Sequence, residues 1–444
     1  FINRGTNLFF GKISFVTNAA GSILQLAVSM DYSIFLLHRF LEYRQEDSDI
    51  EHAMLMAVKK SFGTVVSSGM TAVMGFTALI LMKFKIGPDM GIIMAKALAI
   101  SLVSVMLFFP VLALAMCKLV EKTKHKPFVP SFDKFGEIVF KVGKPMLIVF
   151  AVMLIPCYLA QQKNDFTYGQ SGIYGKGTQL GNDTKRIEDI FGKSNLMVLM
   201  IPKENFSKEK EVSAELLENK NVTSVLSYAE TVGVQIPEEI VPNDTLKKLV
   251  SDHYSRIVIT ADVPTEGESS FNLVDKIKQT AQKHFDNDYM LVGETVNTYD
   301  LKDVITSDDV KVNLLAMLSI AIILLINMKS LILPVILLAI IKLSIWINLT
   351  VPYFANEKLF YIGYLIIGSI QLGATVDYAI LFADRYIENR ENKLPVLAAK
   401  RTLSDTTVSI LTSAGILTCA GLMLGIISSN KIISQLGILV GRGA

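Results

Sequence analysis

The sequence has few of the residues from which disulfide frameworks, metal centres and many active sites are built. It contains three cysteines, five histidines and one tryptophan in 444 residues. Cys117, Cys157 and Cys419 each lie in an apolar stretch, without paired or metal-ligand spacing, and we expect them to be buried thiols. Charged residues are also scarce, at 19%, against 51% hydrophobic residues. Such a chain is too apolar for an ordinary soluble protein, and we expect it to lie in a membrane.

The few charges are distributed unevenly along the chain. Residues 161–310 contain 16 Lys or Arg and 25 Asp or Glu, whereas the rest of the chain contains 27 basic and 16 acidic residues. An acidic block between basic, apolar blocks indicates a soluble domain on one side of a bilayer. The basic loops then belong on the other side.

Long apolar stretches occupy most of the remaining sequence. A membrane-spanning helix needs about 20 mostly apolar residues, and eight such segments are predicted, at roughly 13–38, 62–82, 91–117, 146–160, 312–328, 331–352, 359–383 and 406–428. The chain begins with Phe1 and ends with "SQLGILVGRGA", inside a further apolar stretch. We therefore interpret the sequence as part of a longer chain.

The charge of the loops predicts the orientation in the membrane, because cytoplasmic loops are rich in Lys and Arg. Loops on one side contain 17 such residues, at 39–61, 118–145, 329–330 and 384–405, and the short loops on the other side contain six. The acidic block is thus predicted to lie outside. Residues 118–145 mix cations with apolar residues at helical spacing, which is typical of an amphipathic helix on the inner membrane face or of a solvated basic linker.

An internal repeat is the most informative feature of the sequence. With an offset of 346, "QLAVSMDYSIFLLHRFLEYR" around Asp31 aligns with "QLGATVDYAILFADRYIENR" around Asp377, and eight of the 20 positions are identical. The same offset pairs Gly69 with Gly415, Gly75 with Gly421, Gly91 with Gly437, and Lys96 with Arg442. The fold class predicted is a membrane α-helical bundle with a duplicated helical repeat, a design in which transporters build a site at the repeat interface.

The acidic block between the repeats is predicted to be an α+β domain. Its apolar pattern indicates strands at 195–202, 222–228, 255–263 and 289–296 and helices at 207–219 and 270–285. That order, βαββαβ, is the split βαβ arrangement of ferredoxin-like domains. The predicted division is 1–117 for the first-repeat helices, 118–145 for the linker, 146–162 for a further transmembrane helix, 163–308 for the α+β domain and 309–444 for the second-repeat helices.

Two carboxylates lie inside otherwise apolar helices, and each is followed by a tyrosine: Asp31 with Tyr32, and Asp377 with Tyr378. A charged side chain in the hydrocarbon core costs several kcal/mol unless it is paired, hydrated or neutralised. A carboxyl group deprived of water is suited to bind and release protons, and a tyrosine hydroxyl can serve either protonation state. We predict a proton relay in which Asp31 faces Tyr378 and Asp377 faces Tyr32. The alternative is a static polar contact that holds two helices together.

Further polar residues occur at matching or unusual positions. Lys96 and Arg442 match in the repeat and Lys342 lies mid-helix, so these three are candidate counter-ions; snorkelling toward the headgroups is the alternative for the first two. His38 and Asp384 each follow an aspartate by seven residues, on the same helix face, and are candidates for the cytoplasmic proton exit or simply surface polar residues. Small residues are expected to form close-packing helix faces, namely Gly69, Gly75, Gly415, Gly421, Ser67, Ser68, Thr412 and Ser413.

The duplicated Asp-Tyr pairs, each leading into an Arg-containing helix end ("HRFLEYR" and "DRYIENR"), resemble the MMPL-like branch of the RND (resistance-nodulation-division) transporter superfamily. The stretches "FGKSNLMVLMIP", "KFKIGPDMG" and "GILVGRGA" are similar as well. The resemblance covers essentially the whole chain and implies twelve spans and two porter domains of βαββαβ type, so this chain would lack the first three spans, the first porter domain and most of the last span. It also implies the proton relay at Asp31, Tyr32, Asp377 and Tyr378. One departure from the family pattern is Ala27, where a Gly like Gly373 often stands.

We therefore expect a proton-motive-force-driven exporter of hydrophobic or amphiphilic molecules, such as lipids or drugs, in a bacterial cytoplasmic membrane. Its partners would be that substrate, protons and membrane lipids, without nucleic acid, cofactor or metal, and without enzymatic activity. Two alternatives stay open: an accessory motor for protein translocation, and a non-transporting lipid sensor of the sterol-sensing type. Neither the substrate nor the oligomeric state follows from the sequence.

Overall fold

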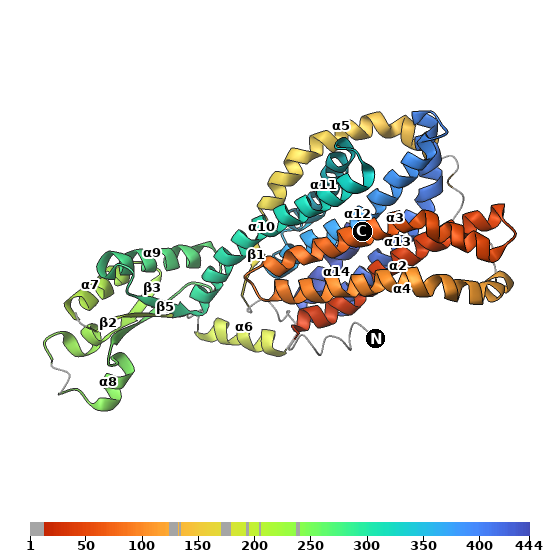
Figure 1. Cartoon of the computed structure of the whole chain (residues 1–444). Helices are drawn as coiled ribbons and strands as arrows, with labels where there is room; N and C mark the ends of the chain where they lie inside the picture. Colours follow the sequence, from red (N-terminus) through yellow and green to blue (C-terminus); the bar gives the residue numbers. More distant parts are fainter. Residues whose placement is uncertain are drawn as a thin grey trace. The chain divides into compact units, whose positions relative to one another are not determined.

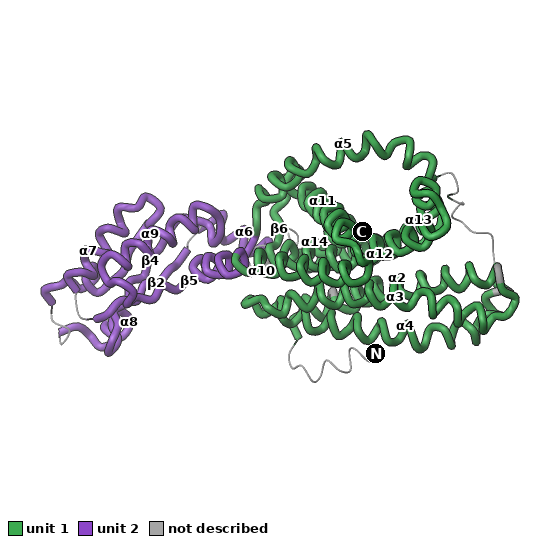
Figure 2. The backbone as a smooth tube through the Cα atoms, turned by 45° about the horizontal axis from the view of Figure 1, so that its top comes forward, with its two compact units in different colours: residues 1–166, 307–444 green, residues 167–306 purple. Residues whose placement is uncertain are grey.

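The chain forms two compact units (Figure 2). The computed structural model describes residues 13–123, 132, 135–169, 179–191, 195–203, 206–236 and 240–444. Unit 1 comprises residues 1–166 and 307–444, and unit 2 comprises residues 167–306. The long helix α10 (Glu294–Met328) begins in unit 2 and continues into unit 1.

Unit 1 is built almost entirely of long helices (Figure 1). They are α2 (Phe15–Glu46), α3 (Ile50–Thr77) with the short η2 (Ala78–Leu81), α4 (Ile86–Lys122), α5 (Phe135–Gln162), α11 (Ile332–Phe354), α12 (Tyr361–Arg390), α13 (Pro395–Ile427) and α14 (Lys431–Gly443). Side-chain caps fix several starts: Asp49 accepts from the amides of Glu51 and His52 before α3, and Asn430 accepts from two amides of α14. Such caps satisfy the otherwise unpaired first amides of a helix.

Seven helices in the described part of the chain are long and apolar enough to cross a membrane. They coincide with seven of the eight predicted segments, and these lie in α3, α4, α5, α10, α11, α12 and α13. The remaining segment, 13–38, lies in α2, a 32-residue helix that is not among the seven. The described residues therefore form a membrane helical bundle, and the span predicted at 13–38 stays a prediction.

Four helices surround the centre of unit 1. α3 and α13 each pack against both α2 and α12, so the two helices with the Asp-Tyr pairs are held between the same two neighbours. α4 covers α2 and α3, and α14 lies against α12 and α13. At one crossing Gly75 of α3 meets Gly373 of α12, where a Cβ added to Gly75 would lie 3.5 Å from the Gly373 Cα. This close approach brings the flank of α12 against α3.

The predicted small-residue faces are confirmed at some positions and wrong at one. An added Cβ at Gly421 would lie 2.6 Å from the Gly441 Cα, which shows how tightly α13 and α14 pack. Gly69 is equally crowded, because an added Cβ would lie 2.9 Å from the Leu102 side chain. An added Cβ at Gly415 would meet nothing within 4 Å. Positions 69 and 415 therefore share the residue type in the repeat, but the two glycines are packed differently.

The predicted linker differs from the structure at its second half. Residues 135–145 form the first part of α5, which runs from Phe135 to Gln162 and also includes the predicted span 146–160. Pro145 lies inside α5 at the boundary between the two predicted segments, and an interior proline removes one backbone hydrogen bond and bends a helix. The position of residues 135–145 relative to the membrane stays a prediction. Residues 124–131, in the middle of the predicted linker, lie outside the described residues.

Unit 2 contains a four-stranded antiparallel sheet in the order β3-β4-β2-β5. Its strands are β2 (Asn195–Pro202), β3 (Val222–Leu226), β4 (Tyr254–Ala261) and β5 (Met290–Gly293). The helices are α6 (Gln179–Phe191), α7 (Phe206–Leu217), the π-helical turn η3 (Ala229–Gly233), α8 (Asn243–Leu249) and α9 (Glu268–Phe285). The chain order β2-α7-β3-β4-α9-β5 places a helix after the first and third strands of the sheet.

The core of unit 2 forms between one face of the sheet and helices α7 and α9. Met197 and Leu199 of β2 and Ile257 of β4 are fully buried there, together with Val212 of α7 and Val274 of α9. In β2 buried residues alternate with more exposed ones, as expected for a strand that buries one face. The predicted strand 289–296 is too long, because β5 ends at Gly293 and α10 begins at Glu294.

Two two-residue strands, β1 (Phe166–Thr167) and β6 (Leu359–Phe360), close one end of unit 1. The Leu359 amide donates to the Asp165 carbonyl at 2.9 Å. The Phe166 ring lies 4.9 Å from the Tyr364 ring, between centroids. These contacts fasten the end of α5 to the start of α12.

Candidate functional site

The two Asp-Tyr pairs meet in one pocket at the centre of unit 1. Asp31 and Tyr32 come from α2 and Asp377 and Tyr378 from α12, and helices α3 and α13 contribute to the lining as well. The Tyr378 hydroxyl donates to Asp31 Oδ2 at 3.5 Å, and Tyr32 lies beside the Asp377 carboxyl. The crosswise arrangement expected from the sequence, each aspartate against the tyrosine of the other copy, is therefore what the structure contains.

Hydroxyl side chains of α3 and α13 complete the surroundings of the carboxyl groups. Ser413 of α13 faces Asp31, and Ser68 of α3 faces Asp377. Both serines are buried, with 5% and 6% of their surface exposed. The sequence predicted only a packing role for these serines, but the structure places them as polar neighbours of the aspartates.

The carboxyl groups are buried with unused hydrogen-bonding capacity. Asp31 and Asp377 are 7% and 6% exposed, and Tyr32 is 2% exposed. Both oxygens of Asp377, Oδ1 of Asp31 and the Tyr32 hydroxyl form no hydrogen bond of ordinary length and angle within the described residues. Ser68 and Tyr32 nevertheless lie close enough to interact with Asp377, and Ser413 with Asp31. A buried polar group without a partner costs about 1–3 kcal/mol, and more if it is charged. Protonation of a carboxylate removes its charge and adds a hydrogen-bond donor. The hydrogen bonds that the carboxyl and hydroxyl groups of the pocket can form therefore change when a proton binds.

The three candidate counter-ions lie away from this pocket. The Arg442 Nε donates to Asn348 Oδ1 at 2.7 Å, and its Nη2 donates to the Asn348 carbonyl at 2.9 Å. The Lys342 Nζ donates to Asn313 Oδ1 at 3.0 Å. Lys96 is half-buried on α4 and does not line the pocket. The contacts of Arg442 and Lys342 are thus with asparagines and not with Asp31 or Asp377, and an exchange of partners during a cycle stays a prediction.

Asp384, one of the two candidate exit residues, continues the polar region beyond the pocket. It faces Thr64, which itself lines the pocket. Its Oδ1 accepts from Asn327 Nδ2 at 3.2 Å, and Asn327 Oδ1 accepts from the Ser67 hydroxyl at 2.9 Å. His38, its counterpart in the first copy, is half-buried on α2. The polar groups thus extend from the aspartates toward the end of α12.

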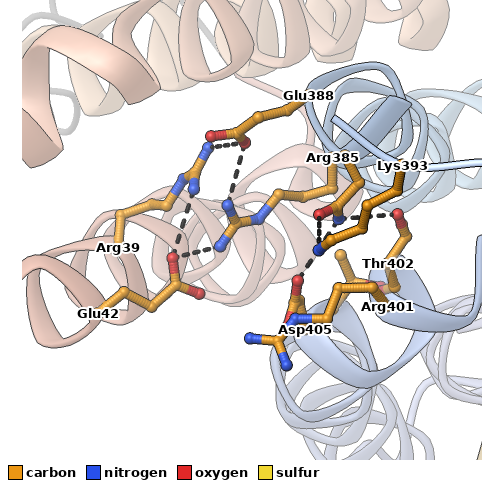
Figure 3. A network of polar contacts seen from close by, with 10 residues as sticks. Arg39, Glu42, Arg385, Glu388, Lys393, Arg401, Thr402 and Asp405 are labelled. Atoms are coloured by element: carbon orange, nitrogen blue, oxygen red, sulfur yellow. Dashed lines mark hydrogen bonds and ion pairs between the residues drawn. The ribbon is translucent and has the colours of Figure 1, made fainter. Parts of the chain in front are cut away.

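A four-residue ion-pair network joins α2 and α12 further along the same helices (Figure 3). The Arg39 Nη2 lies 2.6 Å from Glu388 Oε2, and the Arg385 Nη2 pairs with Glu42 Oε2. Each arginine also pairs with the glutamate on its own helix, at 3.3 Å for Arg39 with Glu42 and 3.0 Å for Arg385 with Glu388. The offset of 346 relates both arginines and both glutamates, so the two copies contribute equally to this network.

A profile of the MMPL family matches residues 6–130 and 176–444 of this sequence. The chain belongs to the MMPL family. With seven helices apolar enough to span a bilayer, it is a multi-pass membrane protein. The family assignment agrees with the resemblance carried by the duplicated Asp-Tyr pairs.

Two curated relatives of this MMPL protein are informative. The apo-petrobactin exporter of Bacillus anthracis is 23% identical over 467 aligned residues, which cover 95% of this chain and 59% of the exporter. A protein of Methanocaldococcus jannaschii described as a membrane protein is 30% identical over 100 residues, or 22% of this chain and 26% of that protein. This chain thus spans little more than half the length of the exporter that it matches.

Sequence reasoning missed two parts of this MMPL protein's site. Ser68 and Ser413 were assigned to packing because a small residue on an apolar helix usually permits close approach. The Arg39–Glu42–Arg385–Glu388 network was not anticipated, although all four residues are identical in the aligned copies. That identity could have predicted the network. When two copies face each other, an Arg and a Glu at matching positions of both copies can form two reciprocal ion pairs.

Proposed function

We propose that this MMPL protein is a proton-motive-force-driven exporter of hydrophobic or amphiphilic molecules, with Asp31 and Asp377 as the proton-carrying groups. The observation that carries the proposal is the crosswise pocket of two buried carboxylates and two tyrosines. It lies between helices of two related halves, where transporters commonly place a coupling site. The relationship to an exporter of B. anthracis supports the direction of transport.

Matching contacts support the duplication of the helical unit. Gln25 Nε2 donates to the Ala97 carbonyl, and Gln371 Nε2 donates to the Gly443 carbonyl. The donors and the acceptors of these two bonds are each separated by the same offset of 346. We propose that the two copies form pseudo-equivalent halves around the relay, each contributing one aspartate.

Unit 2 is proposed to be a ferredoxin-like porter domain outside the cell membrane. Its chain order and its sheet order β3-β4-β2-β5 support the ferredoxin-like assignment. Its acidic character and the Lys- and Arg-rich loops of the membrane region support the orientation, and a bacterial cytoplasmic membrane fits the relative from B. anthracis. Within the described residues no group of three or more His, Cys, Asp or Glu is arranged to hold a metal ion. We propose a transporter that itself catalyses no covalent chemistry.

The pocket suggests how a proton gradient is used. A proton that enters from outside neutralises one carboxylate. The carboxyl group can then donate a hydrogen bond to a neighbouring hydroxyl, whereas the carboxylate could only accept one. The altered set of contacts between α2, α3, α12 and α13 favours a different packing of the two halves, and the proton leaves toward the cytoplasm. Each charge moved across the membrane is worth roughly 2.3 kcal/mol per 100 mV, enough for about a 50-fold gradient of substrate per proton at that voltage.

The test is transport by inverted membrane vesicles that contain the complete protein. Ethidium serves as a drug-like probe and a fluorescent phosphatidylethanolamine as a lipid probe, and an imposed pH gradient supplies the energy. We expect proton-dependent accumulation of at least one probe by the parent, and none by Asp31→Asn or Asp377→Asn, which keep the side-chain shape but cannot change charge. Expression and thermal stability of both variants should remain close to the parent. Parent-level transport by both variants would contradict the relay and favour a static contact.

A further inference from the structure

The arginine–glutamate network occupies a special place relative to the relay. Glu42 and Glu388 follow Asp31 and Asp377 by eleven residues, which is about three helical turns and about 16 Å along each helix. Each glutamate therefore lies on the same face of its helix as the aspartate before it. The relay and the network are two layers of contacts between the same pair of helices, and each layer takes one half from each copy.

The network is unevenly buried. The side chains of Arg39 and Arg385 are 8% and 12% exposed, whereas those of Glu42 and Glu388 are 42% and 41% exposed. An arginine left buried without its carboxylate is strongly unfavourable. Each arginine side chain therefore has two favourable arrangements. It is either paired with the glutamate of the other helix, as in this structure, or exposed to water. A network with two such arrangements is suited to switch between a paired and a separated state rather than to change gradually.

Other charged groups around the network are few and identifiable in the described residues. From α13, Asp405 and Arg401 act on Glu42, and these two pair with each other at 3.0 Å. From α12, Asp384 lies between the network and Thr64 of the pocket, and Arg39 acts on it. Thr64 and Asp384 are thus polar groups between the aspartates and the network.

We infer that Arg39, Glu42, Arg385 and Glu388 form a latch that closes the cytoplasmic end of the relay and opens once in each transport cycle. This inference rests on the proposed function and adds to it the step that controls proton release. The crossed pairs hold α2 and α12 together while the relay exchanges protons with the outside. When the two halves move apart the pairs separate, and water reaches Asp384 and the relay from the cytoplasm.

Removal of the arginines should leave the latch open. In the double variant Arg39→Gln, Arg385→Gln we expect loss of proton-dependent ethidium export together with an increased leak of protons into pyranine-loaded proteoliposomes. The matched control is Arg44→Gln, Arg390→Gln, which also changes two arginines related by the repeat. Arg390 donates to the Lys393 carbonyl and Arg44 to the Asp47 and Ser48 carbonyls, outside the network. The control should export ethidium and retain protons as the parent does.

A reversible cross-link decides between a latch and a static contact, and it does not depend on the folding of the glutamine variant. Cysteines replace Arg39 and Glu388 in a protein whose three natural cysteines are alanine, so the Arg385–Glu42 pair remains. A reagent with two thiol-reactive methanethiosulfonate groups and a short spacer then ties α2 to α12, and a long-spacer reagent is the control. We expect the short link to stop export, reduction with dithiothreitol to restore it, and the long link to leave it active.

The outcomes separate the two proposals. Unchanged export with the short link in place would overturn the latch and leave the exporter intact. If the uncross-linked parent showed no proton-dependent export of ethidium or of the lipid probe, the proposed function would fail first, and the latch with it.

Discussion

The two aspartates of the relay share their residue type but differ in their surroundings. Asp31 accepts a long hydrogen bond from Tyr378, at 3.5 Å, while Tyr32 and Ser68 lie close to Asp377 without a hydrogen bond of ordinary length and angle. Tyr32, which faces Asp377, is more deeply buried than Tyr378, which is only half-buried. At the scale of single residues the site is therefore asymmetric, and the two copies are expected to contribute unequally to proton transfer.

This asymmetry predicts the effects of removing single hydroxyls. Tyr378→Phe removes a hydrogen bond that is present here, and a net loss of about 1 kcal/mol corresponds to roughly a fivefold slower step. Tyr32→Phe removes a hydroxyl without a hydrogen bond in this conformation and should slow ethidium export less than Tyr378→Phe. Initial rates of export in inverted vesicles at matched expression measure both effects. Equal loss in both variants, or loss as complete as in Asp377→Asn, would show that the tyrosines act alike or are indispensable.

At the scale of elements, close helix packing depends on particular glycines. α13 and α14 approach so closely that Gly421 faces the backbone of Gly441. A Cβ added to Gly415, on the same helix, would meet nothing within 4 Å. In a tightly packed interface an additional methyl group forces backbone movement, which typically costs 1–3 kcal/mol. At an open helical position alanine is favoured over glycine by about 1 kcal/mol or less.

Gly421→Ala and Gly415→Ala are therefore predicted to have opposite effects. The first should lower the thermal stability of the detergent-solubilised protein, because the methyl group would overlap the backbone of α14. The second should leave stability unchanged or raise it slightly. Thermal unfolding followed by intrinsic fluorescence or a thiol-reactive dye measures both. Equal stability of the two variants would show that α13 and α14 are not tightly packed in the protein.

Helices α7 and α9 of unit 2 are joined by charges on their outer surface. The Lys283 Nζ lies 3.0 Å from Glu215 Oε2, and the His284 Nε2 lies 3.2 Å from the same oxygen. Lys283 first, and then His284, hold the pKa of the Glu215 carboxyl below its ordinary value of 4.5. A carboxyl group with a lowered pKa in the folded state stabilises the fold at pH values above its ordinary pKa and loses this effect as the pH falls.

The pH dependence of unit 2 can be predicted with its sign. We expect residues 163–308 to fold alone, since the core of the sheet and helices α7 and α9 is complete within unit 2. Glu215→Gln should lower the urea midpoint of this fragment at pH 7, and the difference from the parent should shrink as the pH falls below 4.5. Glu218→Gln, an exposed change just beyond the end of the same helix, is the control and should track the parent. A difference between parent and Glu215→Gln that is independent of pH would contradict the ion pair, and a disordered circular dichroism spectrum would contradict independent folding.

At the scale of the whole molecule, the orientation in the membrane is a prediction from charge alone. Positions 244 in unit 2 and 392 between α12 and α13 are exposed and are predicted to lie on opposite sides of the membrane. A cysteine at position 244 should react with a membrane-impermeant maleimide in intact cells, and one at position 392 should react only after the membrane is opened. Reaction of both in intact cells, or the reverse pattern, would contradict the orientation drawn from Lys and Arg.

The sequence by itself determined those features that repeat or alternate along the chain. The offset of 346 identified Asp31 and Asp377 as equivalent residues, and apolar length predicted eight spans, seven of which coincide with long apolar helices of the described residues. The apolar run at 195–202 predicted strand β2 at its observed bounds. These signals are local, because helix and strand periodicities and the spacing of a repeat are properties of consecutive residues.

Only the tertiary structure decided which distant side chains meet. Arg442 matched Lys96 in the repeat, yet it binds Asn348, because α14 packs beside α11 and α12. Ser413 lies beside Asp31, and Glu42 pairs with Arg385, because α2 and α12 are held between α3 and α13. Such contacts depend on how helices far apart in sequence pack, and a polar residue on an apolar helix offers many possible partners until that packing is fixed.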